Sequence, residues 1–149
     1  MNATEQGGTR EIRTHSLGER DPGDIWGNRQ DGIFVVVSSR SARWTGEDRD
    51  VYGHIDTWYT IRTANESEQA LWMAAQAASA ARKVSRTRLG TTDSHRYDLA
   101  TRQLVCTMTR LDSYDDRWDP PADINLDDEG VAIEEGYLAA LASLKGHQS

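Results

Sequence analysis

The sequence predicts an α+β fold, with a mixed or antiparallel sheet of about four strands packed on an alanine-rich helix. Two observations lead to this class. Five consecutive apolar residues at 33–37, four of them β-branched, predict a strand that is covered on both faces. An alternating run at 51–62 predicts a second strand, and it leads into a helical pattern at 66–84. These elements belong to the expected core, residues 32–112.

Residues 1–31 are polar and predict an extended arm before the core. They contain Gly7-Gly8 and Asp21-Pro22-Gly23, which favour turns, and they show no sustained hydrophobic period. Trp26 is the exception, because a large aromatic side chain in such a segment is often an anchor. We expect Trp26 to dock on the body of its own chain, with docking on a neighbouring subunit as the alternative.

The two predicted strands differ in how they face the core. The strand at 33–37 is apolar throughout, so we expect it at the centre of the sheet, and the polar stretch 38–50 predicts a charged loop after it. In the run 51–62, alternate residues point to opposite faces. The face that we expect to line the core carries Ile55, Thr57, Tyr59 and Ile61.

The helical pattern has clear start and stop signals. Thr63 with Glu66, or Asn65 with Glu68, would form a capping box at its start, and Gly90 can terminate it after a group of cations. One stripe of small residues predicts close approach to a sheet or to another helix. The members of this stripe are Ala70, Ala74, Ala77, Ala81 and Val84.

Residues 94–98 and 102–111 predict a β-hairpin, and residues 113–149 predict an acidic linker followed by a C-terminal helix. Helical spacing resumes at 131–144, after Pro120-Pro121 and a run of acidic residues. Cys106 is the only cysteine, which excludes an intrachain disulfide. We expect its thiol to be an inert member of the core.

The net charge of −7 is unevenly distributed. Residues 1–111 hold 15 Lys or Arg against 14 Asp or Glu, whereas residues 112–149 hold 2 against 10. An acidic tail repels nucleic acids and membrane surfaces, and is suited to a basic protein surface. The excess of arginine over lysine fits either a GC-rich genome or a salt-rich, halophilic host. No segment approaches the roughly 18 apolar residues of a membrane span, so we expect a soluble protein.

The sequence shows no recognisable catalytic cluster. The four histidines are scattered without metal-ligand spacing, and serine, histidine and aspartate occur in no nucleophile-elbow context. A glycine-rich phosphate loop is also lacking. We therefore expect no enzymatic activity, no catalytic residues and no cofactor.

The sharpest candidate for a metal site lies in the acidic linker. Its oxygen ligands would stand at positions 1, 3, 5 and 12 of an EF-hand-like loop, namely Asp123, Asn125, Asp127 and Glu134. Asp128 replaces the glycine that the sixth position requires, and two prolines stand where a helix should precede the loop. We expect an acidic linker that leads into a helix N-terminus, with a cation site as the alternative.

The charged loop also offers candidates for recognition. Its arginines and Trp44 resemble a surface that contacts phosphates and stacks on bases, but Glu47, Asp48 and Asp50 bring its charge near zero. We therefore expect a solvated or subunit-contacting loop and no sequence-specific binding of nucleic acid. The side chains expected at a subunit interface are Trp26, Arg40, Arg43, Trp44 and Trp58.

The order of these segments resembles the tail terminator and tail-completion proteins of long-tailed, siphovirus-like viruses. The resemblance covers residues 31–112, where the apolar strand, the charged loop, Ile55-Asp56-Thr57-Trp58, the alanine-rich helix and the hairpin follow one another. It implies a homohexameric ring that caps the tail tube and joins it to the head connector, with the sheet as the ring wall and no reaction performed. The chain departs from the family in its acidic extension and in lacking a helix before Ile33.

The leading hypothesis is thus a structural virion protein at the tail end or the head–tail junction, assembled in the host cytoplasm. Its expected partners are copies of itself, the tail tube protein and head–tail connector proteins, without a membrane. A tube subunit or another neck component would share the same elements. A small regulatory or anti-defence protein that binds a basic site through its acidic tail is the alternative from a different class.

Overall fold

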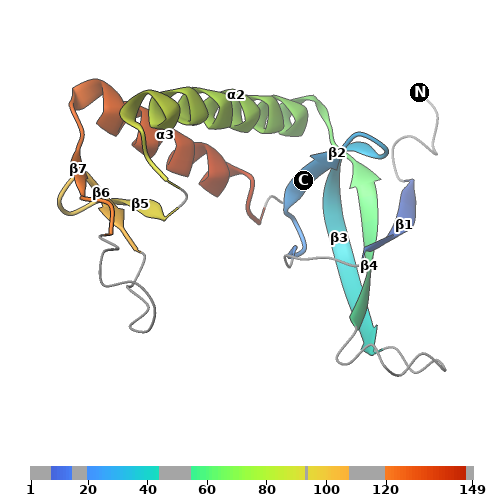
Figure 1. Cartoon of the computed structure of the whole chain (residues 1–149). Coiled ribbons are helices and arrows are strands. Elements are labelled where there is room, and N and C mark those ends of the chain that lie inside the picture. Colours follow the sequence, from blue (N-terminus) through green and yellow to red (C-terminus); the bar gives the residue numbers. More distant parts are fainter. Residues whose placement is uncertain (1–7, 15–19, 44–54, 93, 108–119, 147–149) are drawn as a thin grey trace. The chain divides into compact units, whose positions relative to one another are not determined.

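The computed structural model describes residues 8–14, 20–43, 55–92, 94–107 and 120–146. It confirms the α+β class, with a four-stranded antiparallel sheet, a three-stranded sheet and two helices among these residues (Figure 1). The chain divides into two compact units: unit 1 comprises Met1–Ala75 with Leu141–Ser149, and unit 2 comprises Gln76–Ala140.

The sheet of unit 1 contains two strands from the segment that was expected to be an extended arm. Its strands are β1 (Thr9–Thr14), β2 (Ile25–Asn28), β3 (Gly32–Arg43) and β4 (Ile55–Thr63), in the order β1-β4-β3-β2. Within β1 the only apolar residue is Ile12, which leaves no hydrophobic period to detect. The pairing of β1 with β4 depends on backbone hydrogen bonds, and these carry no sequence pattern.

The core of unit 1 lies on one face of this sheet. Phe34, Val36, Tyr59 and Ile61 are all buried there, and Ile12 and Trp26 pack against them. The expectation that Tyr59 and Ile61 face the core is therefore confirmed. Val35, on the opposite face, is also buried, so residues 34–36 are covered on both sides as predicted, whereas Val37 at the end of the predicted run is exposed.

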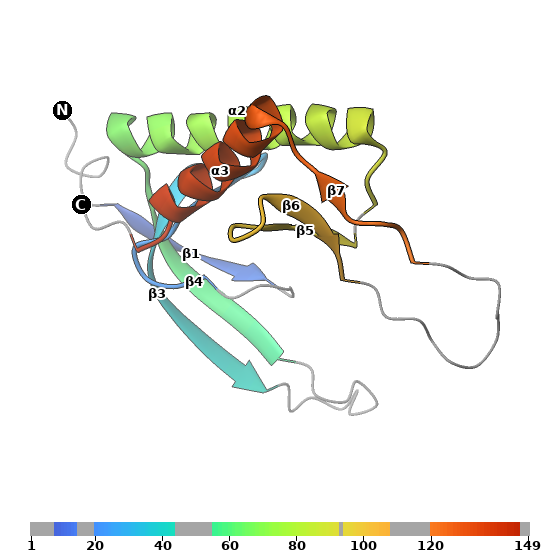
Figure 2. The same cartoon turned by 90° about the vertical axis from the view of Figure 1, so that its left-hand side faces the viewer.

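Strand β3 is much longer than expected, and the predicted loop at 38–50 is wrong for its first six residues. Strand β3 runs beside β4 over most of its length (Figure 2). Residues 38–43 continue this pairing after a bulge at Val37, which is 43% exposed. The side chains in this part are polar, and Ser41 and Thr57 share a hydrogen bond of 3.1 Å across the strands. Such cross-strand pairs stabilise a ladder without an apolar signal. The remainder of the predicted loop, 44–50, lies outside the described residues.

Helix α2 (Glu66–Leu89) begins with the second of the two expected caps. The Asn65 side chain accepts a hydrogen bond from the Glu68 amide (2.9 Å), and the Glu68 carboxylate accepts one from the Asn65 amide (2.8 Å). This reciprocal pair is a capping box. The helix ends as predicted at Gly90, which has a φ of 68°, and the amides of Gly90 and Thr91 close a Schellman motif.

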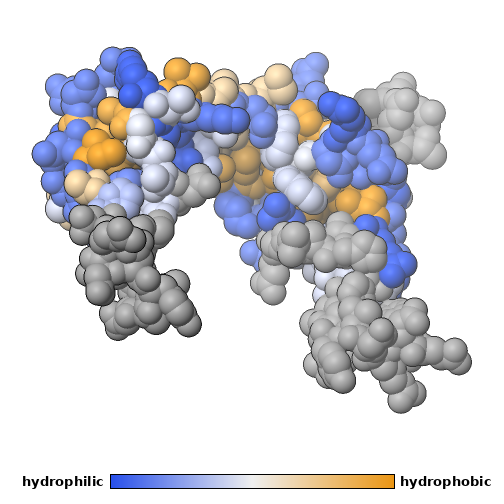
Figure 3. Space-filling model, in the orientation of Figure 1, coloured by the Kyte–Doolittle hydropathy of each residue, from blue (hydrophilic) through white to orange (hydrophobic). Residues whose placement is uncertain are grey.

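The predicted packing stripe of α2 is wrong. Its small residues are exposed, and Met73 and Val84 on the same side of the helix are 61% and 70% exposed, so that apolar side chains reach the surface along α2 (Figure 3). The buried positions are instead Glu68, Ala75 and Ser85. The helix buries the side that carries its ion-pairing residues, because Glu68 binds Arg62 through two hydrogen bonds of 2.8 and 2.9 Å.

Unit 2 contains the expected hairpin in a sheet of its own. The strands β5 (His95–Asp98) and β6 (Gln103–Cys106) pair antiparallel, and β7 (Ile124–Asn125) adds to the other side of β6. Leu104 is fully buried, whereas Cys106 is only partly buried and so is not the core residue that was expected. A two-residue strand such as β7 is too short to leave a sequence pattern.

Helix α3 (Asp128–Ser143) confirms the predicted C-terminal helix and starts three residues earlier than expected. The Asp127 carboxylate accepts a hydrogen bond from the Gly130 amide (2.8 Å) and so caps the helix. Val131 and Leu144 are buried, but Leu138 and Leu141 are about two-fifths exposed. Neither of the two described helices has the length and apolar character needed to cross a bilayer.

Candidate functional site

A cluster of charged side chains surrounds Trp58 on one face of the sheet in unit 1. Arg13, Trp58 and Arg40 lie in one row across β1, β4 and β3. The guanidinium carbon of Arg40 lies 4.3 Å from the centroid of the Trp58 ring, and that of Arg13 lies 5.7 Å from it. Arg40 also donates two hydrogen bonds, of 3.0 and 3.3 Å, to the carboxylate of Glu11. We call these four residues the Trp58 cluster.

The Trp58 cluster contributes little to the stability of the fold. Its ion pair is half exposed on both sides, and exposed ion pairs are worth only about 0–1 kcal/mol. Exposed cation–π contacts are worth a similar amount, about 0.5–1 kcal/mol. The cluster does place a partly exposed tryptophan next to an exposed arginine that is also bound to Glu11. Tryptophan and arginine are the residue types that dominate binding energy at protein interfaces.

Trp26 docks on its own unit, in agreement with the first of the two readings. Its ring meets Phe34 edge to face, with centroids 5.7 Å apart, and the guanidinium of Arg20 lies 4.4 Å above it. Trp26 therefore extends the core of the sheet. Of the other expected interface residues, Arg43 ends β3 and its side chain lies outside the described part of the chain, as does the whole of Trp44.

The four oxygen ligands of the EF-hand-like pattern are engaged in separate interactions. Asp123 accepts a hydrogen bond from the Cys106 amide, Asn125 accepts one from Gln103, and Asp127 caps α3. Glu134 is buried and binds two arginines. Across the described ranges of the chain, no group of three His, Cys, Asp or Glu side chains is arranged to hold a metal ion.

The surroundings of Glu134 form the most strongly charged buried site of unit 2. The carboxylate accepts hydrogen bonds from Nε and Nη2 of Arg86, at 2.7 and 2.8 Å, and from Nε of Arg82 at 3.3 Å. Burial by itself would raise the pKa of Glu134, but the hydrogen bonds and charges of Arg86 and Arg82 outweigh it and hold this pKa below its ordinary value. Glu134 is thus ionised at neutral pH. We call Glu134, Arg82 and Arg86 the Glu134 cluster.

Sequence reasoning missed the Glu134 cluster, because the cations before Gly90, which include Arg82 and Arg86, were interpreted only as part of the signal that ends the helix. Two signals point to it. Arg82 and Arg86 are four residues apart and so share one face of α2, and Glu134 and Glu135 together interrupt an apolar stretch of α3. A buried carboxylate in such a stretch requires a cationic partner.

Comparisons of this chain with protein-family models, with curated proteins and with solved structures find no match.

Proposed function

We propose that this chain is a structural subunit that assembles into a ring through its four-stranded sheet. The observation that carries the proposal is that two six-residue stretches of the sheet have a neighbouring strand on one side only, among the described residues. One is β1, which pairs with β4 and with no other described strand. The other is 38–43 of β3, which lies beyond the last pairing of β3 with β2 and has no strand beside it among the described residues. Each edge is about 20 Å long.

The two edges favour a ring over a symmetric dimer. Strand β1 runs antiparallel to β4, and β4 runs antiparallel to β3, so β1 and β3 point in the same direction. If successive copies are rotated about an axis parallel to the strands, β1 of one copy meets β3 of the next in a parallel pair. This contact joins two different surfaces, and repeated contacts of this kind close into rings. An unpaired edge presents a row of backbone N–H and C=O groups that can pair with a strand of another chain.

The Trp58 cluster lies between these two edges and supports the same proposal. Arg40 stands on the free part of β3, Glu11 and Arg13 stand on β1, and Trp58 stands on β4 between them. A contact along either edge would cover part of this cluster and exclude water from it. The ion pairs and the cation–π contacts of the cluster would then become stronger, because their surroundings would be less polar.

We further propose that the ring is a hexamer at the tail end or head–tail junction of a long-tailed virus, in contact with the tail tube protein and the connector. This assignment depends on the resemblance of residues 31–112 to tail terminator proteins, to which the free sheet edges add physical support. Localisation in the virion is part of the same proposal. Ring formation is the step that can be tested with the purified chain.

Multi-angle light scattering over a range of concentrations and salt levels provides the test. We expect a hexamer for the wild-type chain. Proline at Ser38 or at Ser39 separates assembly from folding, because only one of two consecutive strand residues points its amide towards β4. Of the two proline variants, the one that still gives the wild-type circular dichroism spectrum is folded, and it should no longer form the oligomer. A chain that stays monomeric throughout, or an oligomer that the folded proline variant retains, would contradict the proposal and favour a regulatory binding protein.

A further inference from the structure

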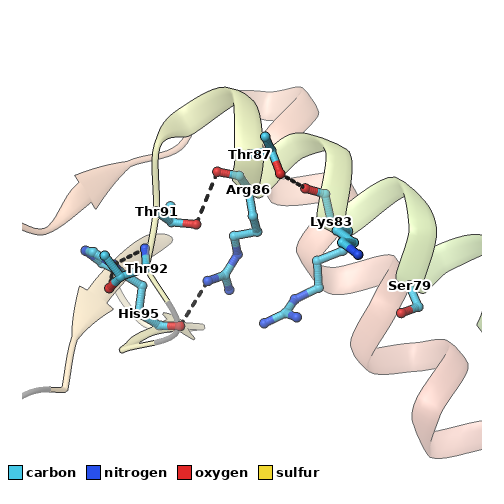
Figure 4. A pocket seen from close by; sticks show the side chains of 8 residues that line it. Ser79, Lys83, Arg86, Thr87, Thr91, Thr92 and His95 are labelled. Carbon is cyan, nitrogen blue, oxygen red and sulfur yellow. Dashed lines mark hydrogen bonds between the residues drawn. The ribbon is translucent and has the colours of Figure 1, made fainter.

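Unit 2 contains a cavity of about 440 Å³ beside the C-terminal turns of α2 (Figure 4). Its wall is formed by α2, by the turn that follows Gly90, and by the start of β5, where Arg86 extends towards His95 (Figure 4). Every side chain that lines it is polar or charged. Pockets for apolar small molecules are lined mostly by apolar and aromatic groups. The wall of this cavity instead suits a charged ligand.

Three cations converge on this cavity, and one carboxylate lies behind them. Arg82, Lys83 and Arg86 line the wall, and Glu134 binds the two arginines from α3. Three positive charges and one negative charge leave an excess of two positive charges. Arg86 is fixed further by a hydrogen bond of 2.9 Å to the backbone oxygen of His95. The arginines are therefore held in place before any ligand arrives.

The cations keep donors that the described part of the chain does not use. Arg82 donates to Glu134 only through Nε, and no described residue accepts a hydrogen bond from its two terminal amino groups. The ammonium group of Lys83 makes no hydrogen bond or ion pair with any described residue. An arginine fork next to a lysine ammonium is a combination that proteins use to bind oxyanions.

The C-terminal end of a helix is a poor place for an anion unless its carbonyl groups are satisfied. At α2 two of the last carbonyl groups are satisfied by the chain itself. The backbone oxygen of Arg86 accepts hydrogen bonds from the amide and the hydroxyl of Thr91, and the backbone oxygen of Thr87 accepts one from the amide of Gly90. The side chains of Arg82 and Lys83 are thus not needed as caps and remain available to a ligand.

We propose that this cavity binds a phosphate group, either free or as a monoester of a small molecule. Arg82 and Lys83 supply the principal donors, and Glu134 positions Arg82 through their ion pair. A phosphate monoester carries a charge of about −1.5 to −2 at neutral pH, which matches the excess of two positive charges in the wall. A single carboxylate would leave about half of that charge uncompensated.

Titration of the full-length chain with inorganic phosphate and with glycerol 3-phosphate tests the proposal, with sodium chloride at matched ionic strength as the reference. Binding is measured by calorimetry and by the amide chemical shifts of Thr91 and Thr92. Lys83→Gln should weaken binding by about tenfold or more, because it removes a charge-assisted hydrogen bond. Arg88→Gln removes the same charge from the same helix outside the cavity, so its affinity should equal that of the wild type.

The two ligands distinguish the source of the phosphate group. Saturable binding of inorganic phosphate alone would identify a site for the free ion. Tighter binding of glycerol 3-phosphate would identify a site for a phosphorylated small molecule. Either result supports the proposal if Lys83→Gln weakens that binding. Equal weakening by Lys83→Gln and Arg88→Gln would overturn it, since that result indicates diffuse charge attraction. The proposal would also be overturned if phosphate changed the amide chemical shifts of Thr91 and Thr92 no more than chloride does.

Discussion

Glu134→Gln tests how much of the stability of unit 2 depends on the Glu134 cluster. Glutamine keeps the shape of the side chain but removes its charge and one of its two acceptor oxygens. Arg86 then loses one of its two short hydrogen bonds, and both arginines lose their counter-charge. Breaking a buried ion pair by removing one partner costs about 3–5 kcal/mol. Because glutamine keeps one acceptor and Arg86 keeps its bond to His95, we expect a loss near the lower limit, about 3 kcal/mol.

Urea denaturation followed by circular dichroism at 222 nm measures this loss, because both helices contribute to the signal. Amide hydrogen exchange in α3 and β5 then shows whether the loss is confined to unit 2. Glu129→Gln is the matched control, since Glu129 is exposed in the first turn of the same helix and should contribute about 0.5 kcal/mol through the helix dipole. A loss for Glu134→Gln no larger than that of this control would refute the reasoning.

The same cluster predicts a dependence of stability on pH. The pKa of Glu134 in the folded chain is lower than its ordinary value of 4.5, because Arg86 and Arg82 outweigh the effect of burial. A carboxyl group whose pKa is lowered by folding stabilises the protein at pH values above its ordinary pKa. This contribution is lost as the pH falls from 4.5 through the lower folded pKa. The difference in unfolding free energy between wild type and Glu134→Gln should shrink over that window, and a difference that stays constant down to about pH 3 would contradict this account.

Four further substitutions test other features by the same urea denaturation. Asn65→Ala removes the side chain that caps α2 and should cost about 1–2 kcal/mol, whereas no change would argue against the capping box. Gly90→Ala places a side chain at a positive φ and should cost about 1–2 kcal/mol. Gly136→Ala lies inside α3 with open space around it and should stabilise by about 0.5–1 kcal/mol. Effects of the same sign would contradict the different backbone conformations of these two glycines. Asp24→Asn should cost about 2–3 kcal/mol at neutral pH, because the buried carboxylate binds Lys145 and two backbone amides.

The elements with strong local signals were predictable from the sequence. Consecutive β-branched residues predicted the start of β3, and alternation predicted which residues of β4 face the core. The start of α2 was narrowed to two possible capping boxes, of which the one at Asn65 forms, and the end of α2 was predicted at Gly90. In each of these cases the residue type itself restricts the backbone or the face that it can occupy.

The elements that depend on partners far away in the sequence were not predictable in this way. Strand β1 and the second half of β3 are held by backbone pairing and polar cross-strand contacts, which leave no apolar period. The wrong stripe of α2 has the same origin. Its alanines indicated a packing face, but ion pairs of Glu68 with Arg62, and of Arg82 and Arg86 with Glu134, decide which side of the helix is buried. A single sequence does not show those pairs.

The bulge at Val37 determines where β3 can change in length. Val36 stands opposite Ile61 and Ser38 stands opposite Thr60, so Val37 is a supernumerary residue with no counterpart in β4. Its loss would leave every other side chain of the strand on its present side. A deletion at one of the following six positions would instead shift the residues between that position and the bulge by one place. Their side chains would then move to the opposite face of the sheet. Natural variants of this strand should therefore lose a residue at Val37 before they lose one anywhere else along it.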